Sequence, residues 1–599
     1  MTRSKGKVAE ARACVFRHDE LVAVAKSAGL SLRVAQTLVC DDPNHRLKSV
    51  PPGGELRHAP MFLARKVSRD EGPVVCFAIG PFLLWSALTC QRFGRSRLVA
   101  TIFRVESLFK ECGVKPPLTK AAPSRRTPHV IMNPTIMKFG GTSVEDARAF
   151  RNVAAIVKAA VASQPVVVVS AIGGFTNALL ASVQKAIEGD ARSATRSLDQ
   201  DLRRHVAIAR ELLNAESSSA FELTVAVARR EIRQLHKIIA VHPVTHPPLQ
   251  DEIVAYGEQL SAQLLAAVLL EEHLAARYVD ARCCVKTDDN YGSAAPLPGT
   301  AAATRAELLP LLDAPRIPVL GGFIGSTDKG VTTTLGRGGS DYSAAIIGAA
   351  LEAREIQIWT DVSGVLTADP RVVKRARTIR VLSYQEAAEL AYFGAKVLHP
   401  KTIQPAIDCR IPVRVCNSRA PGEPGTLIVA ESEAAPQTVK AIAHKNGITT
   451  VQVSSARMLG AYGFLRALFE VFDRHRTAVD VVTTSEVSVS LSIDDAGALP
   501  ELIPDLEQLG AVEVEKHRTI ISIVGEGLRS TPGIAARVFS ELSDINVMMI
   551  SVGASSVNLT FMVEESRASE AIKRLHYVCF EAPEVAESRT ELPAEEVTA

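Results

Sequence analysis

Short apolar runs alternate with longer amphipathic runs along most of the chain after residue 134. Short runs of β-branched residues predict buried strands, and apolar positions that recur every three or four residues predict helices. The expected strands are Thr135–Lys138, Pro165–Ser170, Pro318–Gly322, Glu355–Trp359 and Ile411–Cys416, and the expected helices include Glu145–Ala162, Glu252–Glu271 and Ser340–Glu352. This alternation predicts an α/β fold whose mostly parallel sheet is covered by helices on both faces. Ligands of such sheets bind at the carboxyl ends of the strands.

Two stretches depart from the alternation. Residues 197–242 keep a helical periodicity, with few turn residues before Ser217–Ser219, and this predicts a helical hairpin inserted into the α/β domain. From Ile448 onward, the order strand, helix, strand, strand, helix, strand can be read twice, in about 448–515 and 519–582. We therefore expect a duplicated βαββαβ module of α+β type, arranged in tandem and suited to binding a small molecule.

Composition adds a domain boundary to this picture. A chain of 599 residues should hold about three or four domains. The net charge is only +3, yet residues 1–131 hold 22 Lys and Arg against 10 Asp and Glu, and the remainder is acidic. We expect a basic N-terminal extension (1–131), an α/β domain (132–430), two small modules (431–515 and 516–585) and a tail (586–599).

The basic extension suits a nucleic-acid contact, a membrane contact or a targeting segment. Asp19 and Glu20 argue against an amphipathic transit peptide, and no nucleic-acid-binding motif is present. We expect the extension to be disordered or to precede the native start at Met132. The apolar run 73–90 is about long enough to span a membrane, but Gly80 and Pro81 interrupt it, so a buried or poorly ordered segment is expected.

The ten cysteines form no C-x-x-C pair, and neither H-E-x-x-H nor a His/Cys cluster occurs. These absences argue against a zinc site, a small disulfide framework and a protein-bound transition metal. A reducing cytosol or an organelle stroma fits, and of the two we expect the cytoplasm.

Candidate chemistry begins at the end of the first strand, where Lys138 is followed by Gly140, Gly141 and two hydroxyl residues. A strand, a tight turn and a helix start present backbone N–H groups to an anion, and Lys138 adds a full positive charge. The G-x-x-x-x-G-K-[ST] spacing of P-loop proteins is absent. The stretch predicts a phosphate cradle of another kind.

A second glycine-rich stretch, 335–343, carries Arg337 between glycines and Asp341 at the start of a predicted helix. Arginine can bind a carboxylate with a bidentate fork, and aspartate can accept a hydrogen bond from an ammonium group. Together they suit an α-amino acid, which presents one group of each charge.

These stretches, together with 169–177, 256–261, 359–371 and 393–400, resemble the catalytic domain of aspartokinases, members of the amino acid kinase family. The resemblance covers nearly everything after residue 131. It implies L-aspartate and ATP as substrates, with Mg²⁺ bound to the nucleotide. The implied catalytic residues are Lys138 and Asp341; the substrate-binding residues are Ser170, Thr176, Glu258, Arg337 and Ser340; the ATP-binding residues are Lys138, Gly140, Gly141, Thr360, Asp361, Leu366, Arg371 and Lys396. Glu258 is expected in the first turn of a helix, and Leu366 stands where many aspartokinases have tyrosine.

The two small modules resemble a pair of ACT domains, and the stretches 457–465 and 479–487 resemble the effector-binding segments of lysine-sensitive monofunctional aspartokinases. The implied lysine contacts are Met458, Gly463, Phe464, Asp480, Thr484, Ser485 and Glu486. A helix start at Gly463 suits a carboxylate, and two acids suit the two ammonium groups of lysine. By analogy, ACT pairing implies a homodimer.

The expected activity is ATP-dependent phosphorylation of the L-aspartate β-carboxylate to 4-phospho-L-aspartate. This reaction is the first step of lysine, threonine and methionine biosynthesis, and we expect feedback inhibition by lysine. One alternative is another amino acid kinase, acting on glutamate, acetylglutamate or a nucleotide. Another is an inactive amino-acid sensor. We expect no nucleic-acid or membrane partner, while the full effector set and the choice between dimer and tetramer stay open.

Overall fold

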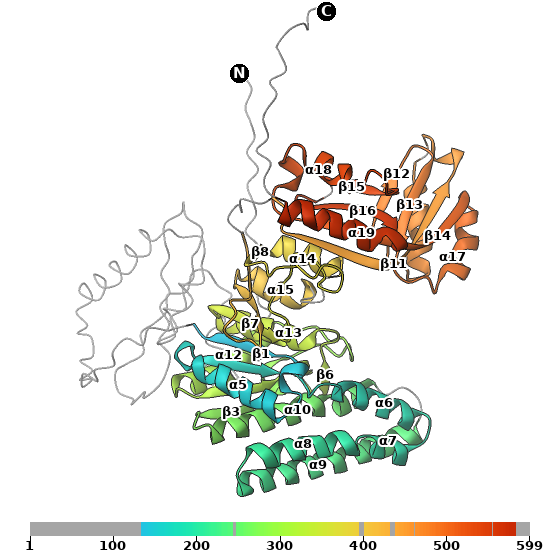
Figure 1. The fold of residues 1–599 in the computed structure, drawn as a ribbon. Helices are drawn as coiled ribbons and strands as arrows, with labels where there is room; N and C mark the ends of the chain where they lie inside the picture. The colour runs from blue at the N-terminus through green and yellow to red at the C-terminus, as the bar shows by residue number, and fades with distance from the viewer. Residues whose placement is uncertain are drawn as a thin grey trace, which may run out of the picture. The chain divides into compact units, whose positions relative to one another are not determined.

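The computed structural model describes residues 133–242, 247–394, 400–431, 438–460, 462–553 and 555–582, all within one compact unit, Pro128–Ala599. The expected extension over 1–131, the apolar run 73–90, Lys396 and the tail over 586–599 lie outside the described residues. Figure 1 follows the chain from the first sheet to the second.

Within the described residues the first sheet has eight strands in the order β3-β4-β2-β1-β7-β9-β10-β8. Their bounds are β1 (Thr135–Phe139), β2 (Pro165–Val169), β3 (Ala276–Val279), β4 (Ile317–Gly321), β7 (Glu355–Thr360), β8 (Val381–Ser383), β9 (Val413–Asn417) and β10 (Thr426–Val429). All neighbours pair in parallel except β9 and β10. A short hairpin, β5 (Ile324–Ser326) and β6 (Thr332–Thr334), follows β4. The five strands expected from the sequence are all present.

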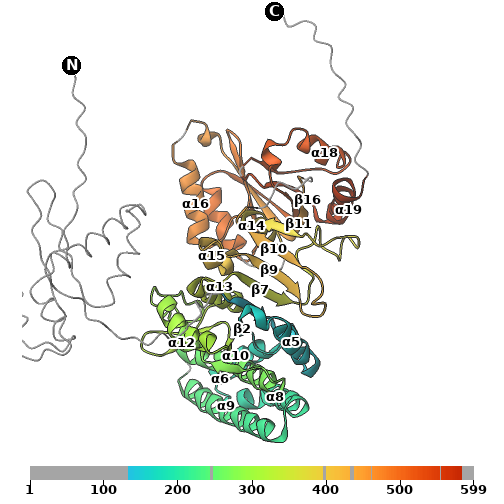
Figure 2. The same cartoon turned by 90° about the vertical axis from the view of Figure 1, so that its left-hand side faces the viewer.

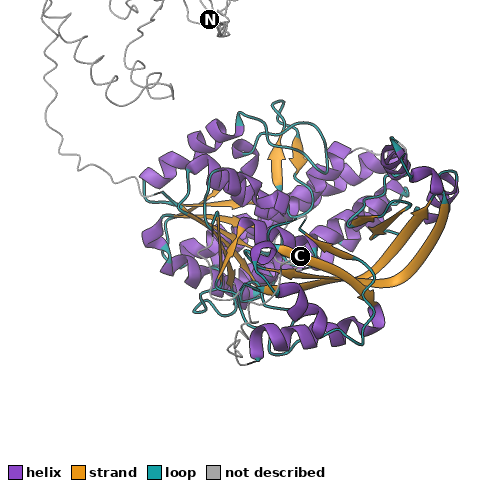
Figure 3. Ribbon diagram, turned by 90° about the horizontal axis from the view of Figure 1, so that it is seen from above, coloured by secondary structure: helices purple, strands orange, loops and turns teal. Residues whose placement is uncertain are grey.

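Fifteen α-helices occur among the described residues, and Figure 3 shows them around the strands. Those that accompany the first sheet are α5 (Ala147–Ala159), α6 (Phe175–Ile187), α7 (Ala191–Ser197), α8 (Asp199–Leu212), α9 (Ala215–Val241), α10 (Pro247–Glu271), α11 (Ala281–Cys284), α12 (Thr300–Asp313), α13 (Gly339–Leu351), α14 (Tyr384–Tyr392) and α15 (Pro400–Asp408). Those of the second sheet are α16 (Phe464–Arg474), α17 (Leu499–Glu507), α18 (Ile534–Ser540) and α19 (Glu565–His576).

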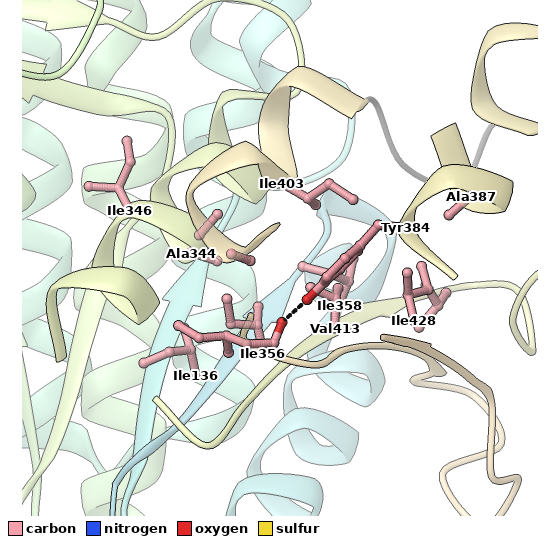
Figure 4. Packing of buried hydrophobic residues seen from close by; sticks show 14 of the residues in the cluster. Ile136, Ala344, Ile346, Ile356, Ile358, Tyr384, Ala387, Ile403, Val413 and Ile428 are labelled. Atoms are coloured by element: carbon pink, nitrogen blue, oxygen red, sulfur yellow. Dashed lines mark hydrogen bonds between the residues drawn. The ribbon is translucent and has the colours of Figure 1, made fainter. Parts of the chain in front are cut away.

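Alternate residues of the central strands divide the core into two layers. Ile136 and Ile356 belong to the cluster that contains Ala344 and Ile347 of α13. Figure 4 shows this layer, with Ile136 and Ile356 near Ala344 of α13 and Val413 beside Ile358. Met137 belongs to the opposite cluster, which contains residues of α5, α6 and α10. Both faces of the sheet are therefore covered, as expected.

The predicted helical hairpin is present as α8 and α9, which lie side by side in Figures 1 and 2. Its turn falls at Leu213 and Asn214, and Ser217–Ser219 lie in the first turns of α9. The reason is local, because the Asn214 side chain accepts a hydrogen bond from the Ser217 N–H and so starts the helix earlier than the serine cluster suggests.

Among the described residues, α10 is the one helix whose length and apolarity would suffice to cross a membrane. Its most apolar window is 78% buried inside the protein. We interpret it as a core helix of the first domain.

The second sheet has six strands among the described residues, in the order β12-β13-β11-β14-β16-β15. Their bounds are β11 (Ala441–Ser454), β12 (Val482–Thr484), β13 (Ser488–Ile493), β14 (Ala511–Val524), β15 (Ile550–Val552) and β16 (Asn558–Glu564). β11 and β14 are long, antiparallel and shared by two βαββαβ modules.

The two modules are interleaved, whereas the sequence pattern suggested a simple tandem. The first module uses residues 448–515 and contains α16 and α17. The second module starts with the later half of β14, but its fourth strand is 441–445, the first half of β11. A segment that precedes the first module therefore completes the second one, and the first module is an insertion within the second.

Candidate functional site

The carboxyl ends of four parallel strands meet where the order of the sheet reverses around β1. The Ser170 N–H donates to the Phe139 carbonyl at 3.0 Å, the Gly140 N–H donates to the Trp359 carbonyl at 3.1 Å, and the Gly322 N–H donates to the Val169 carbonyl at 2.9 Å. Such switch points are where α/β sheets bind ligands. The residues expected from the sequence to carry chemistry follow these strand ends.

A cavity of about 710 Å³ lies at this edge. Its lining includes both residues expected to be catalytic and all five expected to bind substrate: Lys138, Ser170, Thr176, Glu258, Arg337, Ser340 and Asp341. We call it the first cavity. Residues as far apart in the sequence as Lys138 and Asp341 thus line the same cavity.

Lys138 and Asp341 form an ion pair within the first cavity. Lys138 shares a face of β1 with Ile136, and that face packs against α13. Asp341 lies in the first turn of α13, and its Oδ1 is 2.6 Å from Lys138 Nζ. Both side chains are largely buried, so the pair holds the ammonium group in place beside the glycine turn.

Arg337 lies on the short loop between β6 and α13. Gly336 and Gly338 flank it with φ of 76° and 71°, a backbone region that favours glycine. The side chain is exposed, and no carboxylate among the described residues forms an ion pair with it. Its guanidinium group is available for a ligand carboxylate.

Glu258 is buried in the middle of α10 rather than in a first turn, because α10 begins at Pro247. Proline is favoured at a helix start, and the helix therefore begins at Pro247, before the start expected at Glu252. Burial raises the pKa of Glu258 to about 8, although the Ala171 N–H donates a hydrogen bond to the carboxyl group. Its Oε2 atom has no hydrogen-bond partner among the described residues. The Oε2 atom of Glu258 is therefore available to a cationic group or a hydrogen-bond donor of a ligand.

The glycine turn after β1 packs against the loop after β2. A Cβ atom at Gly141 would lie 2.9 Å from the Ala171 carbonyl oxygen, so a side chain there would force the two loops apart. A Cβ atom at Gly140 would lie 3.7 Å from Lys138 Nζ. The backbone of this cradle therefore passes close to the ammonium group.

A second cavity, of about 530 Å³, contains Thr360, Asp361, Leu366 and Arg371, four of the residues expected to bind ATP. The guanidinium of Arg371 forms a bidentate pair with Asp369, with Nη2 2.6 Å from Oδ2. That pairing lowers the pKa of the Asp369 carboxyl group. Residues 442–446 of β11 also line this cavity, and the sequence did not predict their part in it.

The residues expected to bind lysine lie in the first module. Gly463 precedes α16 with φ of 85°, Phe464 begins that helix, and Met458 lies in the preceding turn. Thr484, Ser485 and Glu486 are exposed around the turn between β12 and β13. Asp480 differs, because its carboxylate accepts a hydrogen bond from the Tyr392 hydroxyl and lies 3.4 Å from Lys445 Nζ.

Sequence reasoning missed Asp251, which lies on α10 and lines the first cavity. Its Oδ2 accepts hydrogen bonds from the N–H groups of Gly292 and Thr334, at 2.9 and 2.8 Å. It fixes the loop that leads to Arg337. No local motif marks it, because its partners lie 41 and 83 residues away.

Comparisons with known proteins agree with this geometry. Residues 133–417 match the amino acid kinase family, and residues 521–578 match an ACT domain. The chain is 38% identical to lysine-sensitive aspartokinase 3 of Escherichia coli over 460 residues, 74% of this chain and 99% of that protein. It is also 38% identical to aspartokinase 1, chloroplastic, of Arabidopsis thaliana over 470 residues, 76% of this chain and 81% of that protein.

A crystal structure of E. coli aspartokinase III in complex with aspartate and ADP has a TM-score of 0.64 and 38% identity, and the match covers 75% of this chain and 100% of that one. A structure of the same enzyme with lysine and aspartate gives a TM-score of 0.65. The expected fold, an amino acid kinase domain followed by ACT modules, is confirmed. The chain belongs to the aspartokinase family and is a kinase, a phosphotransferase.

Proposed function

We propose that this aspartokinase transfers the γ-phosphoryl group of ATP to the β-carboxylate of L-aspartate and forms 4-phospho-L-aspartate, the first step of lysine, threonine and methionine biosynthesis. The observation that carries the proposal is the charge arrangement of the first cavity. It combines the guanidinium of Arg337, which pairs with no carboxylate among the described residues, with the buried acid Glu258 and the Lys138–Asp341 pair. The E. coli relative that was solved with aspartate and ADP supports the same substrates.

In this proposal, aspartate binds in the first cavity. Arg337 forms a forked pair with its α-carboxylate, while Glu258 and Asp341 face its ammonium group. Ser170, Thr176 and Ser340 supply hydroxyl groups to the carboxylates. The β-carboxylate then points toward Lys138 and the glycine cradle.

ATP binds across the cradle and the second cavity. Thr360, Asp361, Leu366 and Arg371 contact the nucleoside side, and Gly140, Gly141 and Lys138 contact the phosphates. We also assign Lys396 to the phosphates on the family pattern. The closely packed cradle beside Lys138 fits a polyphosphate. Mg²⁺ would arrive bound to the nucleotide and would neutralise phosphate charge, and the exposed carboxylate of Asp361 in the second cavity would face that charge.

An oxygen of the β-carboxylate attacks the γ-phosphorus, the bond to the bridging oxygen of ADP breaks, and ADP leaves. A carboxylate is already a nucleophile, so no general base is required. The barrier arises because an anion must approach a polyanion. Lys138 lines the first cavity beside the glycine cradle and offsets that repulsion, while Asp341 keeps its ammonium group in position.

We further propose that lysine inhibits the enzyme by binding at the first ACT module through Met458, Gly463, Phe464, Asp480, Thr484, Ser485 and Glu486. Lysine must favour an inactive arrangement over an active one. Because Asp480 is already paired with Lys445 and Tyr392, a bound ammonium group would have to displace or share these partners.

A homodimer formed through the ACT modules is proposed from the apolar surface around the same region. Several large apolar side chains of the first module are exposed: Leu459, Tyr462, Leu465, Phe469, Val482 and Val487. Exposed apolar patches mark interaction sites, and a symmetric pair of modules would cover this one. We propose the cytoplasm as the compartment, although the plant relatives are named chloroplastic.

An ATP-consumption assay with hydroxylamine trapping of the acyl phosphate tests the proposal. We expect product with aspartate and none with glutamate, acetylglutamate or a nucleoside monophosphate. Lysine at millimolar concentration or below should inhibit. Turnover on glutamate in place of aspartate would overturn the substrate assignment, and full activity under saturating lysine would remove the regulatory claim. Binding of aspartate without any turnover would favour the inactive sensor.

Lys138→Ala should lower kcat by about 10²–10³-fold, because it removes a preorganised charge that acts on the transition state. The aspartate KM should change far less. Lys158→Ala is the matched control, because Lys158 is an exposed lysine of α5 whose partner is Glu272. A Lys138→Ala enzyme with normal turnover would show that the assignment of Lys138 is incorrect.

A further inference from the structure

Arg204 of α8 contacts the loop after β1 and the loop after β2, and none of the motif stretches that resemble those of aspartokinases includes it. Its Nε and Nη2 atoms donate hydrogen bonds to the Glu145 carbonyl oxygen at 3.0 and 2.5 Å. Its Nη1 atom donates to the Gly173 carbonyl oxygen at 2.9 Å. One guanidinium group therefore joins two segments that lie 28 residues apart in the sequence.

The first of these carbonyls belongs to the phosphate cradle. Glu145 caps the short 3₁₀ turn Gly141–Val144, which follows Lys138 and β1. The next residue, Asp146, caps α5 with its side chain. Fixing the Glu145 carbonyl therefore fixes the point at which the cradle ends and the helix begins.

The second carbonyl belongs to the loop after β2. Gly173 lines the first cavity beside Ser170 and Thr176. Its N–H group donates to the Gly141 carbonyl oxygen at 3.2 Å. The two loops thus already touch at one backbone hydrogen bond, and Arg204 supplies a second bridge on the other side of Gly173.

The chemistry of arginine explains why this residue can form the bridge. The guanidinium presents five donors in a rigid fork, and Arg204 directs three of its N–H groups to two separate carbonyls. A lysine has a single ammonium centre on a flexible stem and cannot fix the two acceptors with the same geometry. No carboxylate among the described residues forms an ion pair with Arg204, so its role differs from that of an ordinary surface salt bridge.

We propose that Arg204 is a positioning residue for phosphoryl transfer, which sets the separation between the phosphate cradle and the loop that holds the acceptor substrate. The assignment rests on the proposed function, because that function gives the two loops their roles. Reacting groups must be held close to their attack geometry, and a displacement of about 1 Å can cost roughly 10²-fold in rate. Through Arg204, the hairpin α8–α9 would affect the reaction by positioning the two loops, although none of its residues lines the first cavity.

Arg204→Ala and Arg204→Lys test this assignment, with Arg203→Ala as the control, because Arg203 is the exposed neighbour on the same helix. Product is measured as the hydroxamate of aspartyl phosphate, and total ATP cleavage is measured as ADP. We expect Arg204→Ala to lower the rate of product formation by about 10- to 100-fold. The KM values for ATP and aspartate should stay within about threefold.

A separate readout distinguishes positioning from stability. If the loops separate, water can compete for the phosphoryl group, so the ratio of ADP to hydroxamate should rise severalfold in Arg204→Ala. Added guanidinium ion at millimolar concentration should restore part of the product rate. Arg204→Lys should be intermediate, and it keeps the comparison possible if the alanine variant does not fold. Arg203→Ala should match the wild type in rate and ratio.

A normal rate and ratio in Arg204→Ala would overturn the assignment. An equal loss of product and ADP, together with a lowered Tm and no guanidinium rescue, would also overturn it, because it would indicate a purely structural contact. A wild-type enzyme that leaves aspartate unphosphorylated would instead overturn the proposed function and, with it, this assignment.

Discussion

Lys138 occupies its place because residues alternate between the two faces of β1. Ile136 on the same face packs toward α13, and the side chain two residues later meets Asp341 at the start of that helix. This pairing could be expected from the sequence, because both residues lie in glycine-rich stretches of recognisable pattern. The burial of Glu258 could not, since it depends on the neighbours of α10 in three dimensions.

Glu258→Gln should remove a pH dependence from aspartate binding. The raised pKa of about 8 means that Glu258 is mostly neutral below that pH and charged above it. Only the charged form attracts the substrate ammonium group, so the affinity of the wild type for aspartate should increase as pH rises from about 7 to 9. Calorimetric titration at several pH values measures the affinity and the proton released on binding.

In the glutamine variant the affinity should be lower and nearly flat over that range. Glu252→Gln is the control, because Glu252 lies on the same helix and its side chain is partly exposed. A wild-type affinity that falls with rising pH in this window would contradict the role given to Glu258.

Helix α14 connects the two sheets through three polar side chains on one face. Glu386 forms an ion pair with Lys440, with 2.8 Å between Oε2 and Nζ. Glu389 Oε2 accepts a hydrogen bond from Asn558 Nδ2 at 2.6 Å. Tyr392 donates to Asp480. Their spacing of three residues places them along one side of the helix. Their partners come from three segments of the two small modules, because Lys440 precedes β11, Asp480 precedes β12 and Asn558 begins β16. The contacts are non-local, so neither periodicity nor motif could predict them.

Lys440→Met should destabilise the protein by about 3–5 kcal/mol, because it leaves the charge of Glu386 buried without its partner. The side chains of Lys440 and Glu386 are 7% and 0% exposed. Urea unfolding followed by circular dichroism measures the change. Lys374→Met, at an exposed lysine, should leave stability almost unchanged.

Adding Glu386→Gln to Lys440→Met should recover part of the loss, since the unpaired charge is then absent while the amide can still cap α14. A double variant that is less stable than Lys440→Met alone would show that the buried charge is not the cause.

At the scale of the whole molecule, the second cavity belongs to both sheets. Thr360–Arg371 supply one wall, and residues 442–446 of β11 supply another. The second sheet is thus part of the proposed nucleotide site. Any movement of β11 against the kinase domain would change the shape of that cavity.

His444→Asn should raise the KM for ATP about fivefold, the effect of losing roughly 1 kcal/mol of binding. His444 lines the second cavity, and burial lowers the pKa of its imidazole, so it is neutral at physiological pH. The aspartate KM should not change. His517→Asn is the matched control, because His517 is exposed and asparagine tolerates its φ of 59°. An equal rise in both KM values would contradict a nucleotide-specific contact.

The sequence predicted elements better than their connections. The strand expected at Thr135–Lys138 differs from β1 by one residue, because apolar runs and glycine turns are local signals. The sequence did not predict the interleaving of the modules, because the residue pattern of β11 indicates a strand but does not indicate which strand it pairs with. Its pairing with 520–524 depends on contacts about 80 residues apart, and no periodicity reports them. The hydrogen bonds from Arg204 to two carbonyl oxygens were also missed, because their partners lie 59 and 31 residues away in the sequence.

The interleaved strands also determine how this protein can be rebuilt. The chain leaves the second module after Lys445, forms the first module, and re-enters the second module at Arg518. The two points lie next to each other, because Lys445 pairs with Ile520 and Ile448 pairs with Arg518. Closely spaced ends are what makes an inserted domain exchangeable. An engineer could therefore replace 446–517 as a cassette with that of another relative and change effector specificity. A single crossover between the modules would leave the second one without its outer strand.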